Sequence, residues 1–199
     1  MASPPAGYED IIIMAIDECP RIGWASVDED LLEDLIKIEK KYFKKYKIPK
    51  KLRGMLLVTA CIESGYNAHA QGDWVSTGKG TQIARVKGII QLQDWWTKKY
   101  NIDRYDYKEA SEAWMKHIVK QRYQIEKLKW CSPRLSDKQK WIGAWIQTMH
   151  SETGKNNEHP SARTCCWASD TCRKSPHNDL LKTWYRLIDE HQHNNGCDC

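Results

Sequence analysis

The sequence predicts a mainly α-helical fold with one principal domain. Apolar residues recur at the three- and four-residue spacing of a helix in several stretches, whereas no stretch shows the strict alternation of a half-buried strand. The 199 residues fit one domain with a small appendage. The chain is 41% hydrophobic and 29% charged, which is typical of a soluble globular protein, and no apolar run approaches the ~20 residues of a membrane span.

Two helices are expected in the first third of the chain. Asp28 is placed to cap a helix that runs to about Tyr46, because acidic residues crowd its first turns and lysines its last. Residues 50–64 predict a second helix, with an apolar stripe that leads to Glu63 and with Gly65 placed to terminate it.

A long polar segment follows the second helix. Residues 66–87 show no periodicity and are rich in Gly, Ser, Thr and Asn, which predicts a loop without regular structure. Such a loop inside a compact domain is usually functional. Helices are predicted after it from Gly88 to about Tyr100 and over residues 107–130, 136–149 and 178–192.

The chain divides into three parts on these grounds. Residues 1–26 are expected to form an irregular arm, residues 27–155 the principal domain, and residues 156–199 a Cys-rich loop and a C-terminal helix packed on it. The apolar run at residues 11–16 is short and has acidic flanks, so it does not predict a signal peptide. Prior removal of a signal, release by lysis and packaging in a virion all remain open. We expect a monomer.

Eight cysteines favour disulfide bonds in an exported protein. At least one disulfide is predicted within the C-terminal group, which consists of Cys165, Cys166, Cys172, Cys197 and Cys199. Cys61 lies beside a helical apolar run and is expected to be a buried free thiol. Zinc held by the C-terminal thiols and His177 is an alternative. The absence of a Cys-x-x-Cys pair disfavours it, so no metal and no cofactor are expected.

Charge and aromatic content point to a polymer as the partner. The net charge is +5, and basic residues concentrate between Lys37 and Arg53, which suits an anionic polymer or simply a solvated helix face. Ten Trp and nine Tyr accompany one Phe. Trp and Tyr suit carbohydrate clefts because they combine a flat apolar face with a polar edge. Helical spacing assigns Trp114, Trp141 and Trp184 to the core instead.

Glu63 is the strongest candidate for a catalytic group. Its apolar stripe predicts partial desolvation, and the helix C-terminus disfavours a negative charge, so both effects are expected to raise the pKa of the carboxyl. A protonated carboxyl is what transfer of a proton to a glycosidic oxygen requires. The alternative is a surface glutamate at a fraying helix end.

Two short motifs carry a resemblance to known enzymes. Glu63-Ser64-Gly65-Tyr66-Asn67 ends a helix, and Gly88-Ile89-Ile90-Gln91-Leu92 follows the polar loop. Their order and spacing resemble the lytic transglycosylase and goose-type lysozyme families, over about residues 50–150. The resemblance implies a lysozyme-like single domain, here with a Cys-rich C-terminal extension, in which residues 27–155 form the catalytic domain.

The resemblance also implies roles for individual residues. Glu63 would be the catalytic acid, Ser64 would support it by hydrogen bonding, and Gln91 would contact an N-acetylated sugar or position the glutamate. The third motif of these families, Ala-Tyr-Asn, has its nearest match at Ala144-Trp145-Ile146, so the tyrosine hydroxyl and the Asn amide are missing. The expected substrate-binding residues are Ser64, Tyr66, Trp74, Gln91, Gln93, Trp95 and Trp145.

The second catalytic group decides the mechanism. An inverting hydrolase needs a second carboxylate ~6.5–9.5 Å from the acid, which Asp73 in the polar loop would supply. A lytic transglycosylase needs only the first, because the sugar's own 6-hydroxyl attacks. Asp73 could equally serve as a turn residue after Gly72. Trp74 lies in the same loop, and Trp95 is expected one helical turn past Gln91; both could stack on sugar rings.

The sequence therefore predicts cleavage of the MurNAc–GlcNAc β-1,4 bond of peptidoglycan, or of a related N-acetylated polysaccharide, with Glu63 as general acid. The expected location is extracellular, periplasmic or virion-associated. A chitinase or chitosanase of the same fold and a non-catalytic wall-binding protein are the alternatives. An α-helical nucleic-acid binder using the basic stretch is ranked below them, so no nucleic acid is expected as a partner.

Overall fold

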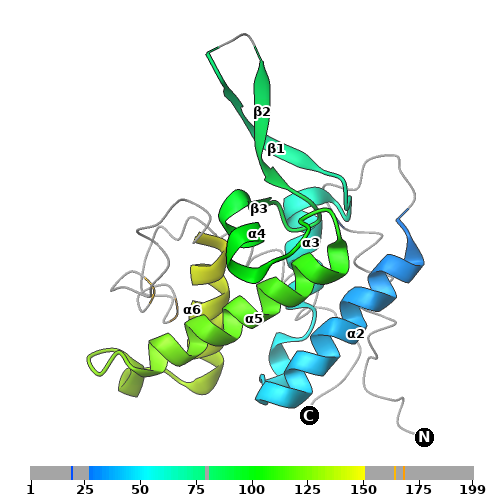
Figure 1. Ribbon diagram of the computed structural model, residues 1–199. Coiled ribbons are helices and arrows are strands. Elements are labelled where there is room, and N and C mark those ends of the chain that lie inside the picture. The colour runs from blue at the N-terminus through cyan, green and yellow to red at the C-terminus, as the bar shows by residue number, and fades with distance from the viewer. Residues whose placement is uncertain (1–18, 20–26, 79–80, 151–163, 165–167, 169–199) are drawn as a thin grey trace, which may run out of the picture.

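The computed structural model describes residues 19, 27–78, 81–150, 164 and 168. Within them the chain is mainly helical, as predicted, with a small sheet on one side of the helices (Figure 1). The order of elements is α2 (Glu29–Tyr46), η1 (Lys50–Leu52), α3 (Met55–Ser64), β1 (Gln71–Ser76), β2 (Gln82–Lys87), β3 (Leu92–Gln93), α4 (Asp94–Tyr100), α5 (Tyr107–Glu126), η2 (Ser132–Arg134) and α6 (Asp137–His150).

Helix α2 has the bounds that its charge pattern predicts. The Asp28 side chain caps it by accepting a hydrogen bond from the Asp30 amide at 3.0 Å. Lys44 and Lys45 occupy the last turn, where the helix dipole favours positive charge, and Lys47 ends the helix in the left-handed conformation. Its apolar face lies in the core and includes Leu31, Leu32, Leu35, Ile36, Ile38 and Phe43.

Helix α3 is the central element for function, and a buried carboxylate fixes its start. Glu39 on α2 is fully buried and accepts hydrogen bonds from the amides of Gly54 at 2.7 Å and Leu56 at 2.9 Å. These amides lie at the N-terminus of α3, where a negative charge satisfies otherwise unpaired donors. Residues 55–61 of α3 are buried, so the helix runs through the core and brings Glu63 to its far end.

The expectation of a structureless loop over residues 66–87 is wrong. This segment forms β1 and β2, which pair with β3 in an antiparallel sheet of order β1-β2-β3. The strands escape sequence reasoning because β1 has no fully buried position and shows no apolar alternation. The β1–β2 hairpin projects beyond the helices (Figure 1).

The predicted helix start at Gly88 is also wrong. Gly88 and Gln91 have positive φ values of 82° and 52°, which a right-handed helix cannot contain. They form a turn, in which the Gln91 amide donates to the Gly88 carbonyl at 3.1 Å. Strand β3 follows this turn, and α4 begins only at Asp94.

A disulfide joins Cys19 to Cys61, so the expectation that Cys61 is a free thiol is wrong. The partner lies 42 residues earlier in the chain, a separation at which no local pattern indicates the pairing. Closing a loop of this length stabilises the fold by about 4 kcal/mol, because the cross-link lowers the conformational entropy of the unfolded chain. Cys131 is disulfide-bonded as well. The predicted C-terminal disulfide, zinc alternative, C-terminal helix and Trp184 lie outside the described residues.

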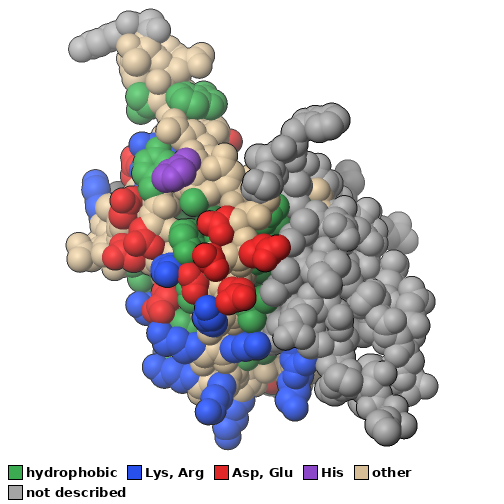
Figure 2. Space-filling view, turned by 90° about the vertical axis from the view of Figure 1, so that its right-hand side faces the viewer, with side chains coloured by type: hydrophobic (Ala, Val, Ile, Leu, Met, Phe, Trp, Pro, Cys, Tyr) green, Lys and Arg blue, Asp and Glu red, His purple; other side chains and the backbone are tan. Residues whose placement is uncertain are grey.

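The core is continuous and rich in tryptophan. Trp114 and Trp141 are buried as predicted, and Trp96 and Trp145 are fully buried with them. None of the helices in the described part of the chain is long and apolar enough to cross a membrane. On the face shown in Figure 2, carboxylates gather across the middle, with basic side chains mainly below them and the hairpin above.

Candidate functional site

Glu63 lies in the last turn of α3 and is partly buried, as its apolar stripe predicts. One turn earlier, Thr59 and Ala60 are fully buried. The helix ends because Gly65 adopts a left-handed conformation, and its amide donates to the Cys61 carbonyl at 2.9 Å. The carboxyl therefore leaves the core at a helix C-terminus.

Ser64 joins the two motifs that the sequence singles out. Its hydroxyl lies 2.7 Å from the carbonyl oxygen of Ile89 and 3.1 Å from that of Ala60. The shorter contact links the end of α3 to the Gly88–Gln91 turn across 25 residues of sequence. Through this contact Ser64, the residue next to Glu63, fixes the end of α3 against the turn that carries Gln91.

Gln91 is enclosed by its own turn and by β1. Its side-chain amide donates to the Gly88 carbonyl at 2.8 Å, and the residue is 7% exposed. A Cβ atom on Gly72 would lie 2.6 Å from the Gln91 Oε1 atom, so a larger residue at position 72 would displace this carboxamide from its observed place. With so little exposed surface, Gln91 is better placed to fix the turn than to present a wide contact to a sugar.

Arg104 supports the same turn and was missed by sequence reasoning. A Cβ atom on Gly88 would lie 1.9 Å from the Arg104 carbonyl oxygen, so the two backbones touch at Gly88. The buried Arg104 guanidinium donates to the Leu92 carbonyl at 2.8 Å and to the Arg85 carbonyl at 3.2 Å, and it forms an ion pair with Asp94. No local pattern distinguishes this arginine from a surface residue.

Asp73 and Trp74 both lie on β1 and are exposed. Asp73 has a φ of 49°, and its side chain makes no hydrogen bond or ion pair with the described residues. Trp74 is 54% exposed and pairs with Ala84, on the side of the sheet that also carries Gly72. Because the Gln91 side chain reaches Gly72, the sheet connects the exposed Trp74 to the turn beside α3.

Trp145 was expected to contact substrate, and this is wrong because its side chain is fully buried. Its indole Nε1 donates to the Thr59 hydroxyl at 3.0 Å, and this hydroxyl donates to the Met55 carbonyl at 2.8 Å. Thr59 is one helical turn before Glu63. Trp145 therefore supports the helix that carries Glu63 rather than the substrate.

The helical placement of Trp95 relative to Gln91 is wrong, since Gln91 precedes α4. Trp95 is partly buried, its ring centroid lies 4.5 Å from that of Trp96, and Lys99 Nζ is 4.6 Å from its ring centroid. Gln93 is partly buried and pairs with Val86 at the start of α4. These contacts place Trp95 against the core.

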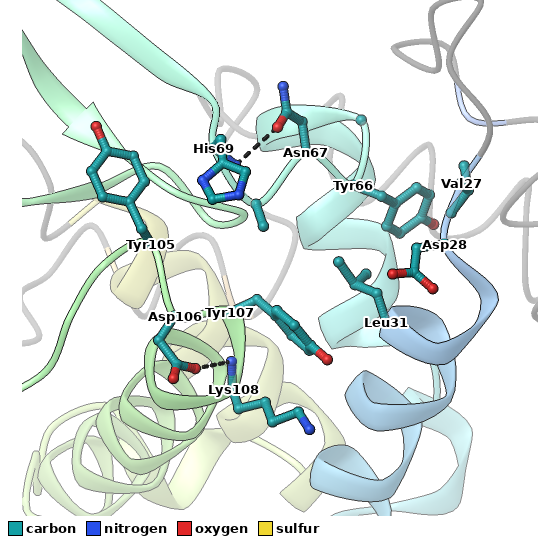
Figure 3. A pocket seen from close by; sticks show the side chains of 12 residues that line it. Val27, Asp28, Leu31, Tyr66, Asn67, His69, Tyr105, Asp106, Tyr107 and Lys108 are labelled. Atoms are coloured by element: carbon teal, nitrogen blue, oxygen red, sulfur yellow. Dashed lines mark hydrogen bonds between the residues drawn. The ribbon is translucent and has the colours of Figure 1, made fainter.

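Tyr66 is separated from the other predicted site residues. It is 5% exposed and lines a pocket between α2, the α3–β1 connection and α5 (Figure 3). None of Glu63, Ser64, Asp73, Trp74 and Gln91 lines this pocket. The structure thus brings Ser64, Gln91 and the Gly72 edge of β1 together, and it places Tyr66 in the wall of a pocket that these residues do not line.

The described residues contain no group of three or more His, Cys, Asp or Glu side chains that could hold a metal ion. No family model matches the chain, and neither a curated protein nor a solved structure matches it.

Proposed function

We propose that the chain is a lysozyme-like glycosidase that cleaves the MurNAc–GlcNAc β-1,4 bond of peptidoglycan, with Glu63 as the general acid. The observation that carries the proposal is the hydrogen bond from Ser64 to Ile89, because it joins the Glu63-Ser64 and Gly88–Gln91 segments on which the family resemblance rests. Partial burial of Glu63 at a helix C-terminus is an environment that favours a proton-donating carboxyl.

In this mechanism Glu63 donates a proton to the oxygen of the leaving sugar as the glycosidic bond breaks. The second step follows one of two routes. Asp73 activates a water molecule in an inverting hydrolase, or the 6-hydroxyl of the MurNAc residue attacks and returns its proton to Glu63 in a transglycosylase. Trp74 offers its exposed face to the glycan beside this site.

Mass spectrometry of products from purified peptidoglycan tests the proposal. A 1,6-anhydro end identifies a transglycosylase, and a reducing end identifies a hydrolase. Chitin and chitosan oligomers serve as parallel substrates, since the same fold could act on either. Binding without any product would establish a wall-binding protein and overturn the proposal.

The remaining assignments follow from this function. A peptidoglycan-cleaving enzyme works outside the cytoplasm of its target, so we propose an extracellular, periplasmic or virion-associated location. We propose that it acts as a monomer, without a cofactor.

A further inference from the structure

The pocket beside Tyr66 is lined by residues that directly follow Ser64, but Glu63, Ser64, Asp73, Trp74 and Gln91 are not among its lining residues. Its volume is about 810 Å³, and three segments form its walls: the start of α2, the α3–β1 connection and the start of α5 (Figure 3). Pockets of this size hold small ligands. Nothing in the proposed cleavage mechanism uses it.

The charge of the pocket selects against anions. Two helix N-termini meet here, but Asp28 caps α2 and Asp106 caps α5, each through one carboxylate oxygen. Both aspartates line the pocket, and their second oxygens make no hydrogen bond with the described residues. The one lysine in the wall, Lys108, is paired with Asp34 at 2.8 Å. The helix ends are therefore already occupied, and negative charge remains.

The surrounding face reinforces this charge. Glu29, Asp30 and Glu109 occupy the first turns of the same two helices. Figure 2 shows carboxylates gathered on this side of the molecule, although the chain as a whole carries a net charge of +5. Hydrogen bonds from Lys108 and Tyr107 hold the pKa of Asp34 at about 2, so this carboxylate stays charged.

The polar groups in the wall are suited to a ligand with an ammonium group. Tyr105, Tyr107 and His69 contribute rings to the wall. Two of these rings already face cations of the chain, since Lys87 Nζ lies 5.5 Å from the Tyr105 ring centroid and Lys108 Nζ lies 5.6 Å from that of Tyr107. The Tyr66 hydroxyl is buried beside Val27 and Asp28 and has no hydrogen-bond partner in the described part of the chain (Figure 3). Burial raises the pKa of this hydroxyl, so it remains neutral and can donate or accept.

We propose that this pocket binds a short peptide with a free ammonium group, the chemistry of an uncrosslinked wall peptide. The choice of a wall peptide rests on the proposed function, whereas the preference for a cation rests on the second carboxylate oxygens of Asp28 and Asp106, with the unpartnered Tyr66 hydroxyl as a further acceptor. The enzyme would hold the peptide of its polymer here while it cleaves the glycan elsewhere.

Calorimetry on the full chain tests the pocket with the tripeptide Nα-acetyl-alanyl-γ-glutamyl-lysine amide, whose only ammonium group is on the lysine side chain, and with its Nε-acetylated form. Asp28→Asn with Asp106→Asn removes both charges and keeps two good N-caps. We expect this double variant to weaken binding of the free amine about tenfold, and acetylation to weaken binding to the wild type equally. Acetylation should have little further effect on the double variant.

Three controls make the result specific. Glu126→Gln removes a carboxylate charge at the opposite end of α5 from the pocket and should leave binding unchanged, as should Glu63→Gln. Tyr66→Phe removes the hydroxyl alone and should weaken binding several-fold. If the double variant does not fold, the inference is tested by the affinity of Tyr66→Phe for the free amine and by the affinity of the wild type for the acetylated peptide.

Equal binding of the two peptides, no binding at millimolar concentration, or binding of a neutral disaccharide that competes at this pocket would each overturn the inference. Peptidoglycan cleavage is measured separately on the same samples. Cleavage without peptide binding refutes only the pocket, and peptide binding without cleavage refutes only the proposed function.

Discussion

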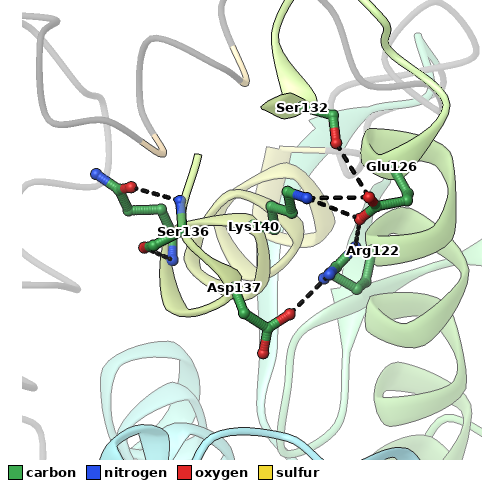
Figure 4. Close-up of polar contacts among 7 residues, drawn as sticks. Arg122, Glu126, Ser132, Ser136, Asp137 and Lys140 are labelled. Carbon is green, nitrogen blue, oxygen red and sulfur yellow. Dashed lines mark hydrogen bonds and ion pairs between the residues drawn. The ribbon is translucent and has the colours of Figure 1, made fainter. Parts of the chain in front are cut away.

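The α5–α6 pair and the junction between α3 and the Gly88–Gln91 turn are held by different kinds of contact. Between α5 and α6, Arg122 pairs with Asp137 at 2.7 Å, and Lys140 pairs with Glu126 at 3.0 Å (Figure 4). These ion pairs are linked, because Glu126 also pairs with Arg122, and the helices beneath them pack through buried apolar side chains. The junction is held mainly by hydrogen bonds to backbone carbonyls, which come from Ser64, Gln91 and Arg104, and by a close backbone contact at Gly88.

This difference indicates which of the two regions is more sensitive to substitution. Redundant ion pairs can lose a member at small cost, because exposed pairs contribute little and the core remains. At the junction, Ser64 supplies the side-chain hydrogen bond from the end of α3 to the turn, and it is the residue next to Glu63. We therefore expect changes at the junction to affect both folding and cleavage, and changes at α5–α6 to affect stability alone.

Gly88→Ala should give the largest effect. The added Cβ would meet the Arg104 carbonyl at 1.9 Å, so we expect a loss of at least about 3 kcal/mol in the free energy of unfolding, together with most of the activity. Gly78→Ala is the matched control. It has a similar positive φ of 75° but no atom within 4 Å, and should cost only about 1 kcal/mol. Equal losses in urea denaturation would contradict the close contact.

Trp74→Ala should weaken binding of a muro-oligosaccharide by about 1–3 kcal/mol, because a stacked sugar ring buries apolar area on both partners. The melting temperature of the variant should hardly change. Trp130→Ala is matched in residue type and in its 54% exposure but lies after α5, so it should leave binding unchanged. Calorimetry that finds the same affinity for Trp74→Ala and the wild type would rule out stacking.

Ser64→Ala should cost about 1 kcal/mol of stability, since the Ile89 carbonyl loses its hydroxyl partner. Cleavage should fall by about tenfold as Glu63 loses its fixed position. Ser64→Thr keeps the hydroxyl and should recover most of both. A Ser64→Ala enzyme with wild-type rate and stability would show that the junction does not position Glu63.

Glu126→Gln should give the smallest effect, below about 1 kcal/mol, because the carboxylate is half exposed. Hydrogen bonds from Lys140 and Arg122 lower the pKa of Glu126 from 4.5 to about 2. A lowered folded-state pKa means that its contribution is fully present above pH 4.5 and is lost as the pH falls towards 2. The difference in stability between variant and wild type should therefore vanish near pH 2. A difference that persists there would have another cause.

The helices were predictable because each carries its own signals. Asp28 and Asp106 cap helices, Gly65 ends one, and the apolar stripes face the core. The strands were not predictable, since β1 buries none of its residues fully. Local patterns also could not show contacts between distant residues, such as Cys19 with Cys61 or Gly88 with Arg104.

The candidate site was predictable only in part. The motifs identified Glu63, Ser64 and Gln91, and the structure links Ser64 to the turn that holds Gln91. Trp145 was misassigned because helical spacing does not reveal whether a tryptophan faces the core or a cleft. Tyr66 was placed with Glu63 because they are neighbours in sequence, although the left-handed Gly65 between them redirects the chain.

Glu63→Gln tests the central claim most directly. The substitution keeps the shape and the hydrogen-bonding capacity of the side chain but removes the transferable proton. Release of soluble fragments from purified peptidoglycan should fall by ~10²–10⁴-fold, with an unchanged melting temperature and unchanged binding to the wall. If the variant with glutamine releases fragments at the wild-type rate, Glu63 is not the catalytic acid and the account is contradicted.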